Sequence, residues 1–492
     1  MGQGSACQEV RNSNNYIDFH CHPSLKPFGK SFDAQPVGEN STDRRRKKSI
    51  WYYDPPSVFD KILNYISGLT KFSQSNFTAL TLGGISTVCV SLYPLEKWFI
   101  RNRMKNELIL DLASNFALGI GAKRVDHIQG IDDYFEDLVL QYEYYRQLDG
   151  KVFRISGNKV RYKLVRNYDD IRRYREEEPV TKIKTIAVII SIEGLHVLNT
   201  GLDKSPTEAE VLQNINKIKN WEYRPFFITV AHHFWNHICG HAPSLTGIIL
   251  NYTDQEEGLG EGFTSLGKKV LMQMLNNTDG RRIFPDIKHM SINARKEYYD
   301  LLDNGGDDFK DIPVIVSHGA CNGLHSFKDP TPFHQETAAV LNPVTINFFD
   351  EELVRIARSG GIIALQLDER RIASKETLKN TKKSVKRHKI MHYRSELLWH
   401  QIRHILTVLD SKEIFAWDCI AIGSDFDGII DSLNGFWTAE ELPFLADFLE
   451  RHAYNYMENV SLKLPENKID ADEIIQRIFS VNGDRFLSRY FK

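Results

Sequence analysis

Short apolar stretches alternate with amphipathic stretches along most of the chain. Eight apolar stretches are five to eight residues long and rich in β-branched residues, and most are too apolar for a strand with one face in water. This pattern is typical of parallel strands that are covered on both faces. The predicted strands are residues 16–20 (YIDFH), 86–92 (STVCVSL), 185–192 (TIAVIISI), 226–232 (FFITVAH), 284–290 (FPDIKHM), 313–318 (PVIVSH), 361–367 (GIIALQL) and 419–425 (CIAIGSD).

Helical patterns lie between these strands. In residues 131–147 the apolar positions recur every three or four residues, as an amphipathic helix requires. The alternation of strand and helix predicts an α/β fold, a (β/α)8 TIM barrel with right-handed crossovers. A doubly wound open sheet is the alternative, but no glycine-rich phosphate loop supports it. The other predicted helices are residues 58–69, 207–220, 261–276, 292–302, 349–359 and 395–410.

The chain is expected to form one barrel domain over residues 1–492, with insertions at 26–80 and 370–394, after the first and seventh strands. Both insertions contain basic runs, at 44–48 and 370–389. Such runs usually belong to a solvated face. The alternative for the second is a lid, or a segment that attracts an anionic substrate. Residues 150–178 predict a hairpin across Ser156-Gly157-Asn158, followed by a short helix.

Composition excludes several classes of function. A net charge of −2 gives no global attraction to nucleic acid, and no run of about 18 apolar residues predicts a transmembrane helix. The six cysteines form no CxxC pair, and the first fifteen residues are polar, which together predict reduced thiols and a cytoplasmic protein. The expected partner is a small molecule. The sequence leaves open whether the chain forms a homodimer.

Candidate catalytic residues stand where the predicted strands end, which is where active sites of such barrels lie. His20 and His22 project to the same side of the first strand. A single histidine at a strand end is more often a satisfied core residue than a ligand. Here, however, six of the eight strands end in or near a histidine or carboxylate. The others are Glu193, His232, His289, His318 and Asp425.

Four histidines with carboxylates suit a pair of divalent ions, with zinc first. Glu193 is the natural bridge between two cations about 3.5–4 Å apart. A water shared by two cations is acidified to hydroxide near neutral pH, and Asp425 is placed to carry its proton to the leaving group. A metal or a neighbouring histidine would polarise the scissile carbonyl. The sequence therefore predicts amide or ester hydrolysis, and no GxSxG motif competes.

These motifs resemble those of the membrane dipeptidase (renal dipeptidase) family of the amidohydrolase superfamily. The resemblance covers almost the whole chain outside 26–80 and 370–394 and implies a TIM barrel of the metal-dependent amidohydrolase type. The 422–428 piece is quite specific, and the others are specific in combination. The matching pieces are residues 18–22 (DFHCH), 192–196 (IEGLH), 229–232 (TVAH) with Asn236, 286–291 (DIKHMS), 313–318 (PVIVSH), 422–428 (IGSDFDG) and 482–487 (NGDRFL).

The resemblance implies a role for each matching residue. His20 and His22 would bind the first zinc, His289 and His318 the second, and Glu193 would bridge the two zinc ions. His232 would contact the substrate carbonyl or the tetrahedral intermediate, with Asn236 also on the substrate side. Asp425 would handle the proton.

Two positions depart from the family pattern. The family usually has His-x-Asp at the first strand, whereas this chain has His-x-His, which adds one positive unit relative to a carboxylate. The family places an arginine for the substrate carboxylate about eleven residues after the second-metal histidine. Here Asp329 stands there with Lys328 beside it. We expect Lys328 to bind the substrate carboxylate. The alternative is that Lys328 is an exposed loop residue, in which case Arg370, Arg371 or the basic segment after strand seven would hold the carboxylate.

The sequence favours a dipeptidase-like hydrolase that cleaves a peptide or other small amide bond with a zinc-activated water. An amidohydrolase acting on a non-peptide ester, lactone or cyclic amide is the first alternative. The second is an inactive barrel that serves as a binding protein, and the presence of the whole set of ligands and of Asp425 speaks against it.

Overall fold

The structure is a computed structural model that describes residues 15–32, 45–67, 70–100, 119–245, 253–332, 334–381 and 386–492. Arg44 of the first basic run lies outside the described residues, and Arg45 and Arg46 are exposed. Within the described ranges, no helix combines the length and the apolar character needed to cross a membrane.

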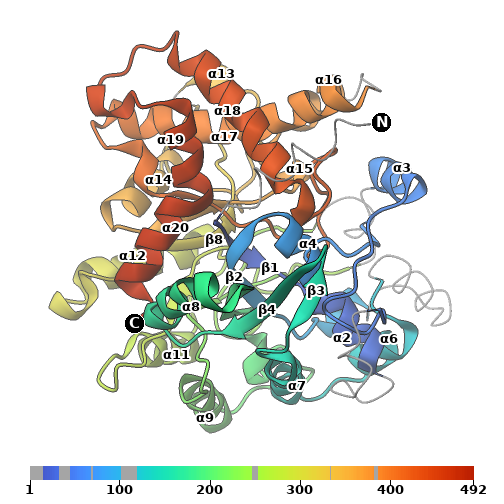
Figure 1. The fold of residues 1–492 in the computed structure, drawn as a ribbon. Helices are drawn as coiled ribbons and strands as arrows, with labels where there is room; N and C mark the ends of the chain where they lie inside the picture. Colours follow the sequence, from blue (N-terminus) through green and yellow to red (C-terminus); the bar gives the residue numbers. More distant parts are fainter. Residues whose placement is uncertain are drawn as a thin grey trace.

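Eight parallel strands close into a barrel (Figure 1). The pairing runs β2-β1-β10-β9-β8-β7-β6-β5, and β5 pairs back onto β2 over Thr87–Leu92 and Ala187–Ile192. This closure confirms the predicted (β/α)8 barrel and excludes the open sheet. The barrel strands are β1 (Tyr16–Cys21), β2 (Ile85–Leu92), β5 (Ile183–Glu193), β6 (Phe227–Thr229), β7 (Phe284–Asp286), β8 (Ile315–Gly319), β9 (Ile362–Leu365) and β10 (Ile420–Ile422).

A hairpin extends the sheet beside β5. Strands β3 (Phe153–Ile155) and β4 (Asn158–Leu164) are antiparallel, and β4 runs parallel to the first half of β5. Ser156 and Gly157 form the two-residue turn with φ of 49° and 84°, the left-handed conformation that matches strand twist in tight hairpins. The predicted hairpin is therefore confirmed. It leads into helix α8 (Tyr168–Thr181).

Helices surround the barrel because each strand needs an apolar cover on its outer face. In Figure 1, α7, α9 and α11 cover one side, while α14, α17 and α18 lie at the other. All seven predicted helices are present, and α17 begins eight residues earlier than the predicted start at 395, inside the second predicted insertion. The helices named here are α3 (Val58–Ser67), α7 (Tyr134–Leu148), α9 (Glu208–Lys219), α11 (Ser265–Leu275), α12 (Ile292–Asn304), α14 (Asp350–Arg358), α17 (Arg387–Ser411) and α18 (Leu442–Met457).

Parts of the two predicted insertions are integrated into the barrel. Trp51 packs against Phe77, and both lie against Tyr162 of the hairpin, with ring centroids 4.5–6.1 Å apart. Asp427 at the mouth of the barrel accepts hydrogen bonds from Lys26 Nζ at 2.7 Å and from the Ser75 backbone at 2.8 Å. Asp427, which ends the eighth predicted strand, therefore anchors the first insertion. In the second insertion, α15 (Glu369–Ile372) forms part of the wall of a cavity, and α16 (Lys375–Thr381) follows α15 in the chain.

Candidate metal centre

Four histidines from three strand ends meet at the carboxyl end of the barrel. His20 lies in β1, His22 follows it directly, His289 comes three residues after β7, and His318 lies in β8. The Nε2 atoms of His20 and His22 are 3.0 Å apart, and those of His289 and His318 are 3.3 Å apart. All four side chains are buried. The structure thus brings together the histidines that the sequence predicted.

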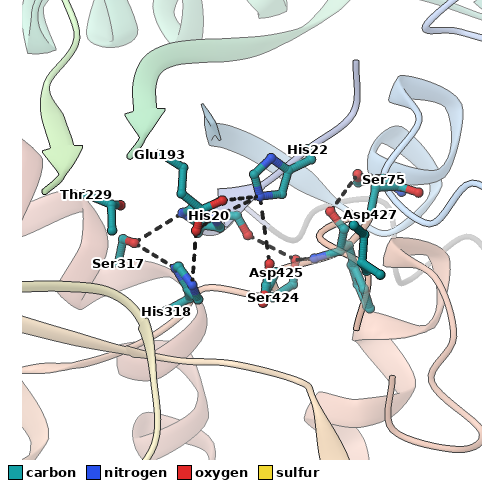
Figure 2. A network of polar contacts seen from close by, with 12 residues as sticks. His20, His22, Ser75, Glu193, Thr229, Ser317, His318, Ser424, Asp425 and Asp427 are labelled. Carbon is teal, nitrogen blue, oxygen red and sulfur yellow. Dashed lines mark hydrogen bonds and ion pairs between the residues drawn. The ribbon is translucent and has the colours of Figure 1, made fainter. Parts of the chain in front are cut away.

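Glu193, the last residue of β5, lies within reach of both histidine pairs, and Figure 2 shows it beside His20, His22 and His318. Its Oε2 is 3.1 Å from His22 Nε2, and its Oε1 is 3.5 Å from His20 Nε2. The same Oε1 is 3.6 Å from His289 Nε2 and 3.4 Å from His318 Nε2. Burial raises the pKa of this carboxyl, but the surrounding histidines, His232 and His20 foremost, outweigh burial and hold the pKa well below its ordinary value. Glu193 is therefore a carboxylate that reaches both pairs.

This donor set fits divalent metal ions. The ligand atoms of His20, His22 and Glu193 lie within 4.8 Å of one another, and so do those of Glu193, His289 and His318. Burial lowers the pKa of His289 and His318 well below the ordinary value, with neighbouring histidines adding to the effect, so both rings are neutral and keep a nitrogen lone pair. Neutral imidazole and carboxylate are the ligands that zinc uses in hydrolases.

Ser317 and Asp286 orient two of the rings, a role that was not predicted for either residue. The Ser317 hydroxyl donates to Asp286 Oδ2 at 2.6 Å and lies 3.1 Å from His20 Nδ1 and 3.0 Å from His318 Nδ1. Because its proton is given to Asp286, this oxygen can only accept, so each ring donates from Nδ1. The Nε2 lone pairs of both rings then point toward Glu193. Such partners raise the basicity of a ligand and fix its tautomer.

Backbone conformation at two site residues is costly. His289 and Asp425 have φ of 65° and 60°, in the left-handed region that non-glycine residues rarely adopt. The Ala242 N–H donates to the His289 carbonyl at 2.8 Å, and the Asp425 N–H donates to the His20 carbonyl at 2.9 Å. These hydrogen bonds hold the residues in place. Strain of this kind, about 1–3 kcal/mol each, is concentrated at functional sites.

His232 approaches Glu193 from the end of β6 with its orientation set by Glu96. Its Nε2 lies 3.5 Å from Glu193 Oε1, and its Nδ1 lies 2.7 Å from Glu96 Oε2. Tyr93 O–H donates to the same Glu96 oxygen at 3.0 Å. Burial lowers the pKa of His232, but Glu193 and Glu96 more than compensate, so it lies above the ordinary value. Glu96 follows β2 by four residues, and its only sequence signal was that of a carboxylate after a strand.

Asp425 lines the cavity beside the cluster, with its Oδ1 3.8 Å from His22 Nε2. Burial, followed by the charge of Glu193, raises the pKa of Asp425 well above its ordinary value. A Cβ at Gly428 would lie 2.0 Å from Asp425 Oδ1, so only glycine leaves room for this carboxylate. The narrow cavity, about 60 Å³, is also lined by Tyr93, Phe99, Glu193, His232, His233, Ser244, Leu245, Lys288, His289, His318, Gln366, Asp368, Arg370, Arg371, Ile429 and Ile430.

Two predicted substrate contacts lie outside this cavity. Asn236 is buried and uses its side chain to hold its own loop, donating to the Val230 carbonyl at 2.8 Å and accepting from the Ile238 N–H at 3.0 Å. Lys328 is exposed in a tight surface turn, where the Ser326 N–H donates to the Asp329 carbonyl at 3.0 Å. Lys328 therefore does not line the cavity, and the structure shows it as an exposed loop residue, which was the alternative to a substrate contact.

The alternative cations after strand seven do reach the cavity. Arg370 and Arg371 belong to α15, and both line the cavity. Arg370 Nε and Nη2 donate to the two oxygens of Asp368 at 3.0 and 2.9 Å. Arg371 donates to the Ser244 carbonyl. The first part of the second basic segment is thus a wall of the site.

A protein-family model, Membrane dipeptidase (Peptidase family M19), matches residues 146–467, about two thirds of the chain. The chain belongs to this family. The match covers the segments that bear Glu193, His232, His289, His318 and Asp425. The first histidine pair lies before the matched region, so the geometry of β1 is what adds it to the site.

Two solved metallopeptidase structures share the fold of this membrane dipeptidase family member. A dipeptidase AC of family M19 aligns with 97% of this chain and 99% of its own at 13% identity and a TM-score of 0.50. A metallopeptidase from Rhodobacter sphaeroides, solved with a phosphinate mimic of the dipeptide L-Ala-D-Ala, aligns with 97% of this chain and 99% of its own at 12% identity and a TM-score of 0.51. No curated protein sequence matches the chain significantly. At these identities the likeness supports the barrel alone.

Proposed function

We propose that this M19 metallopeptidase is a dipeptidase-like hydrolase that uses two zinc ions to cleave a peptide or other small amide bond. The observation that carries the proposal is the position of Glu193. Its carboxylate lies within 3.1–3.6 Å of the Nε2 atoms of two separate histidine pairs. A carboxylate within reach of two histidine pairs is suited to hold two metal ions at the spacing that two-metal hydrolases use.

The chain's own residues divide the work of holding the ions. His20 and His22 would hold one ion, His289 and His318 the other, and Glu193 would contact both. When bound, two such ions supply an acidified water as nucleophile and polarise the scissile carbonyl. A second histidine at position 22, where the family usually has a carboxylate, leaves the protein ligands with one negative charge fewer. This difference favours retention of an anionic nucleophile or substrate group.

Asp425 and His232 are proposed to manage the proton and the carbonyl oxygen. Asp425 stands 3.8 Å from His22 at the cavity edge, where a carboxyl can take a proton from the nucleophile and deliver it to the leaving nitrogen. His232 presents Nε2 to the cavity while Glu96 holds its Nδ1, so it can donate a hydrogen bond to the oxygen that becomes negative in the transition state.

The first test combines metal content with hydrolysis. Zinc-reconstituted protein should hold close to two zinc ions per chain and hydrolyse members of a dipeptide panel that includes D-residue and β-alanyl forms. Glu193→Ala should lose most of both ions, whereas Glu136→Ala, which removes an exposed carboxylate of α7, should keep them. A metal content near zero in the reconstituted wild type would refute the proposal.

The substrate panel separates the alternatives. Turnover of esters, lactones or cyclic amides in the absence of dipeptide turnover would assign the site to a non-peptide amidohydrolase. Full metal content without turnover of any of these substrates would favour an inactive barrel that binds other molecules.

A further inference from the structure

Apart from the proposed metal ligands, two buried hydrogen-bond donors of cavity-lining residues have no partner among the described residues. They are Lys288 Nζ and Gln366 Nε2, whose side chains are each 1% exposed. Lys288 lies between Asp286, which ends β7, and His289, and Gln366 follows β9 directly. Both line the cavity beside the histidine cluster. Two residues with an unsatisfied donor thus line the same small cavity from two strand ends.

Such donors are costly to bury. A buried polar group without a hydrogen bond costs roughly 1–3 kcal/mol in proteins, and an unpaired buried charge costs more. Folded proteins therefore leave few of them, and those that remain call for an explanation. An acceptor from the substrate would satisfy both groups at once.

The neighbouring charges favour an anion as that acceptor. The wall contains three basic side chains, Lys288, Arg370 and Arg371. Apart from Glu193, which lies among the histidines, and the proposed proton carrier Asp425, it offers one carboxylate, Asp368, among its described residues. Asp368 is already paired with Arg370, which donates hydrogen bonds to both carboxylate oxygens. Arg371 is turned to the Ser244 carbonyl, which is uncharged. Lys288 is left as the basic side chain with no anionic partner in hydrogen-bond range among the described residues.

We propose that Lys288 and Gln366 form a carboxylate-binding subsite beside the metal cluster and that Lys288 determines a preference for substrates with a free acid group. A carboxylate has two oxygens, so one can accept from Lys288 Nζ and the other from Gln366 Nε2. The charged bond supplies most of the discrimination between acid and amide. This inference rests on the proposed function, since it assigns the substrate end next to the scissile bond.

The test measures binding of a phosphinate mimic of L-Ala-D-Ala to the zinc-loaded protein by calorimetry. Two forms are compared, one with a free C-terminal carboxylate and one with a C-terminal amide. The wild type should bind the acid about 10–100-fold more tightly, as expected for a charge-assisted hydrogen bond in a buried site. Lys288→Met should remove most of this preference by weakening the acid form while changing the amide form little.

Two further variants complete the design. Gln366→Glu keeps the side-chain size but places a negative charge beside the bound acid, so it should weaken the acid form more than the amide form. Lys328→Met removes an exposed lysine outside the cavity and should leave the preference as in the wild type. Either of the cavity variants tests the subsite if the other fails to fold.

The possible results separate failure of the subsite from failure of the proposed hydrolase function. Equal weakening of both forms by Lys288→Met, or a wild type without any preference, would overturn the subsite while leaving the hydrolase proposal intact. A zinc-loaded wild type that binds neither form would remove both. Loss of the preference in Lys288→Met but not in Lys328→Met would support the assignment.

Discussion

Ser317→Ala should disturb the orientation of two histidine rings while leaving every proposed metal-ligand atom in place. The change removes one hydroxyl that accepts from His20 Nδ1 and His318 Nδ1, one ring from each proposed metal site. The barrel should survive, because Asp286 keeps its hydrogen bonds from Thr229 Oγ1 at 2.6 Å and from the Ser317 backbone at 3.0 Å. The variant therefore isolates the orientation of the rings.

The expected loss follows from the hydrogen bonds removed. Each is worth about 1 kcal/mol, so two bonds give about 2 kcal/mol, or roughly a 30-fold loss of zinc affinity shared by the two sites. Loss of an outer partner of a metal ligand generally costs 10–100-fold in affinity, which agrees. The stoichiometry should remain two zinc ions per chain, because every ligand atom is still present.

Competition with a chromophoric chelator measures this affinity directly. Ser424→Ala is the matched control: it removes a buried hydroxyl that donates to Asp18 at 2.6 Å and contacts no imidazole. It should reduce stability by a similar amount but zinc affinity by much less. Zinc affinity in Ser317→Ala equal to that of the wild type, or equal losses in both variants, would refute the claim that Ser317 fixes the two rings.

Three further changes test other parts of the site. Asp425→Asn should keep both metals and the fold but reduce kcat about 10²–10⁴-fold, and wild-type turnover would show that Asp425 has another role. Lys288→Met should raise the melting temperature of the metal-free protein, by an amount equivalent to about 1–3 kcal/mol, because it removes a buried donor that has no partner among the described residues. A lower melting temperature would show that Lys288 Nζ has a hydrogen-bond partner in the folded protein. Burial raises the pKa of Asp427, but Lys26 and hydrogen bonds from Ser75 outweigh it, so the pKa is depressed on folding. This carboxylate therefore stabilises the fold fully above its unfolded pKa of about 3.9 and loses that contribution as the pH falls through the pKa of the folded state. Asp427→Asn should accordingly flatten the dependence of stability on pH below about pH 4, as measured by denaturant unfolding.

The fold was predictable because its signals are local. Each barrel strand is an apolar run, and the carboxyl ends of parallel strands meet at one mouth, so His20, Glu193 and His318 could be placed together from their positions alone. Hairpin β3–β4 could likewise be predicted from the turn residues Ser156-Gly157. Boundaries were less certain: α17 continues eight residues into a segment whose charge suggested an insertion.

The partners of the ligands could not be found in the same way. Ser317 owes its role to one hydroxyl that reaches rings from two strands, and Glu96 acts through His232, which lies 136 positions later. Nothing in their local sequence distinguishes them from ordinary strand-end residues. Lys328 shows the opposite case: its distance along the chain from His318 suggested a substrate contact, but the structure places it on the exposed surface, outside the cavity.

The central claim is that two metal ions lie on either side of Glu193. Anomalous diffraction at the zinc edge from crystals of zinc-reconstituted protein tests it most directly. The account predicts two anomalous peaks, one between Glu193 and the pair His20 and His22, the other between Glu193 and the pair His289 and His318. A single peak, or peaks away from Glu193 in fully reconstituted protein, would contradict it.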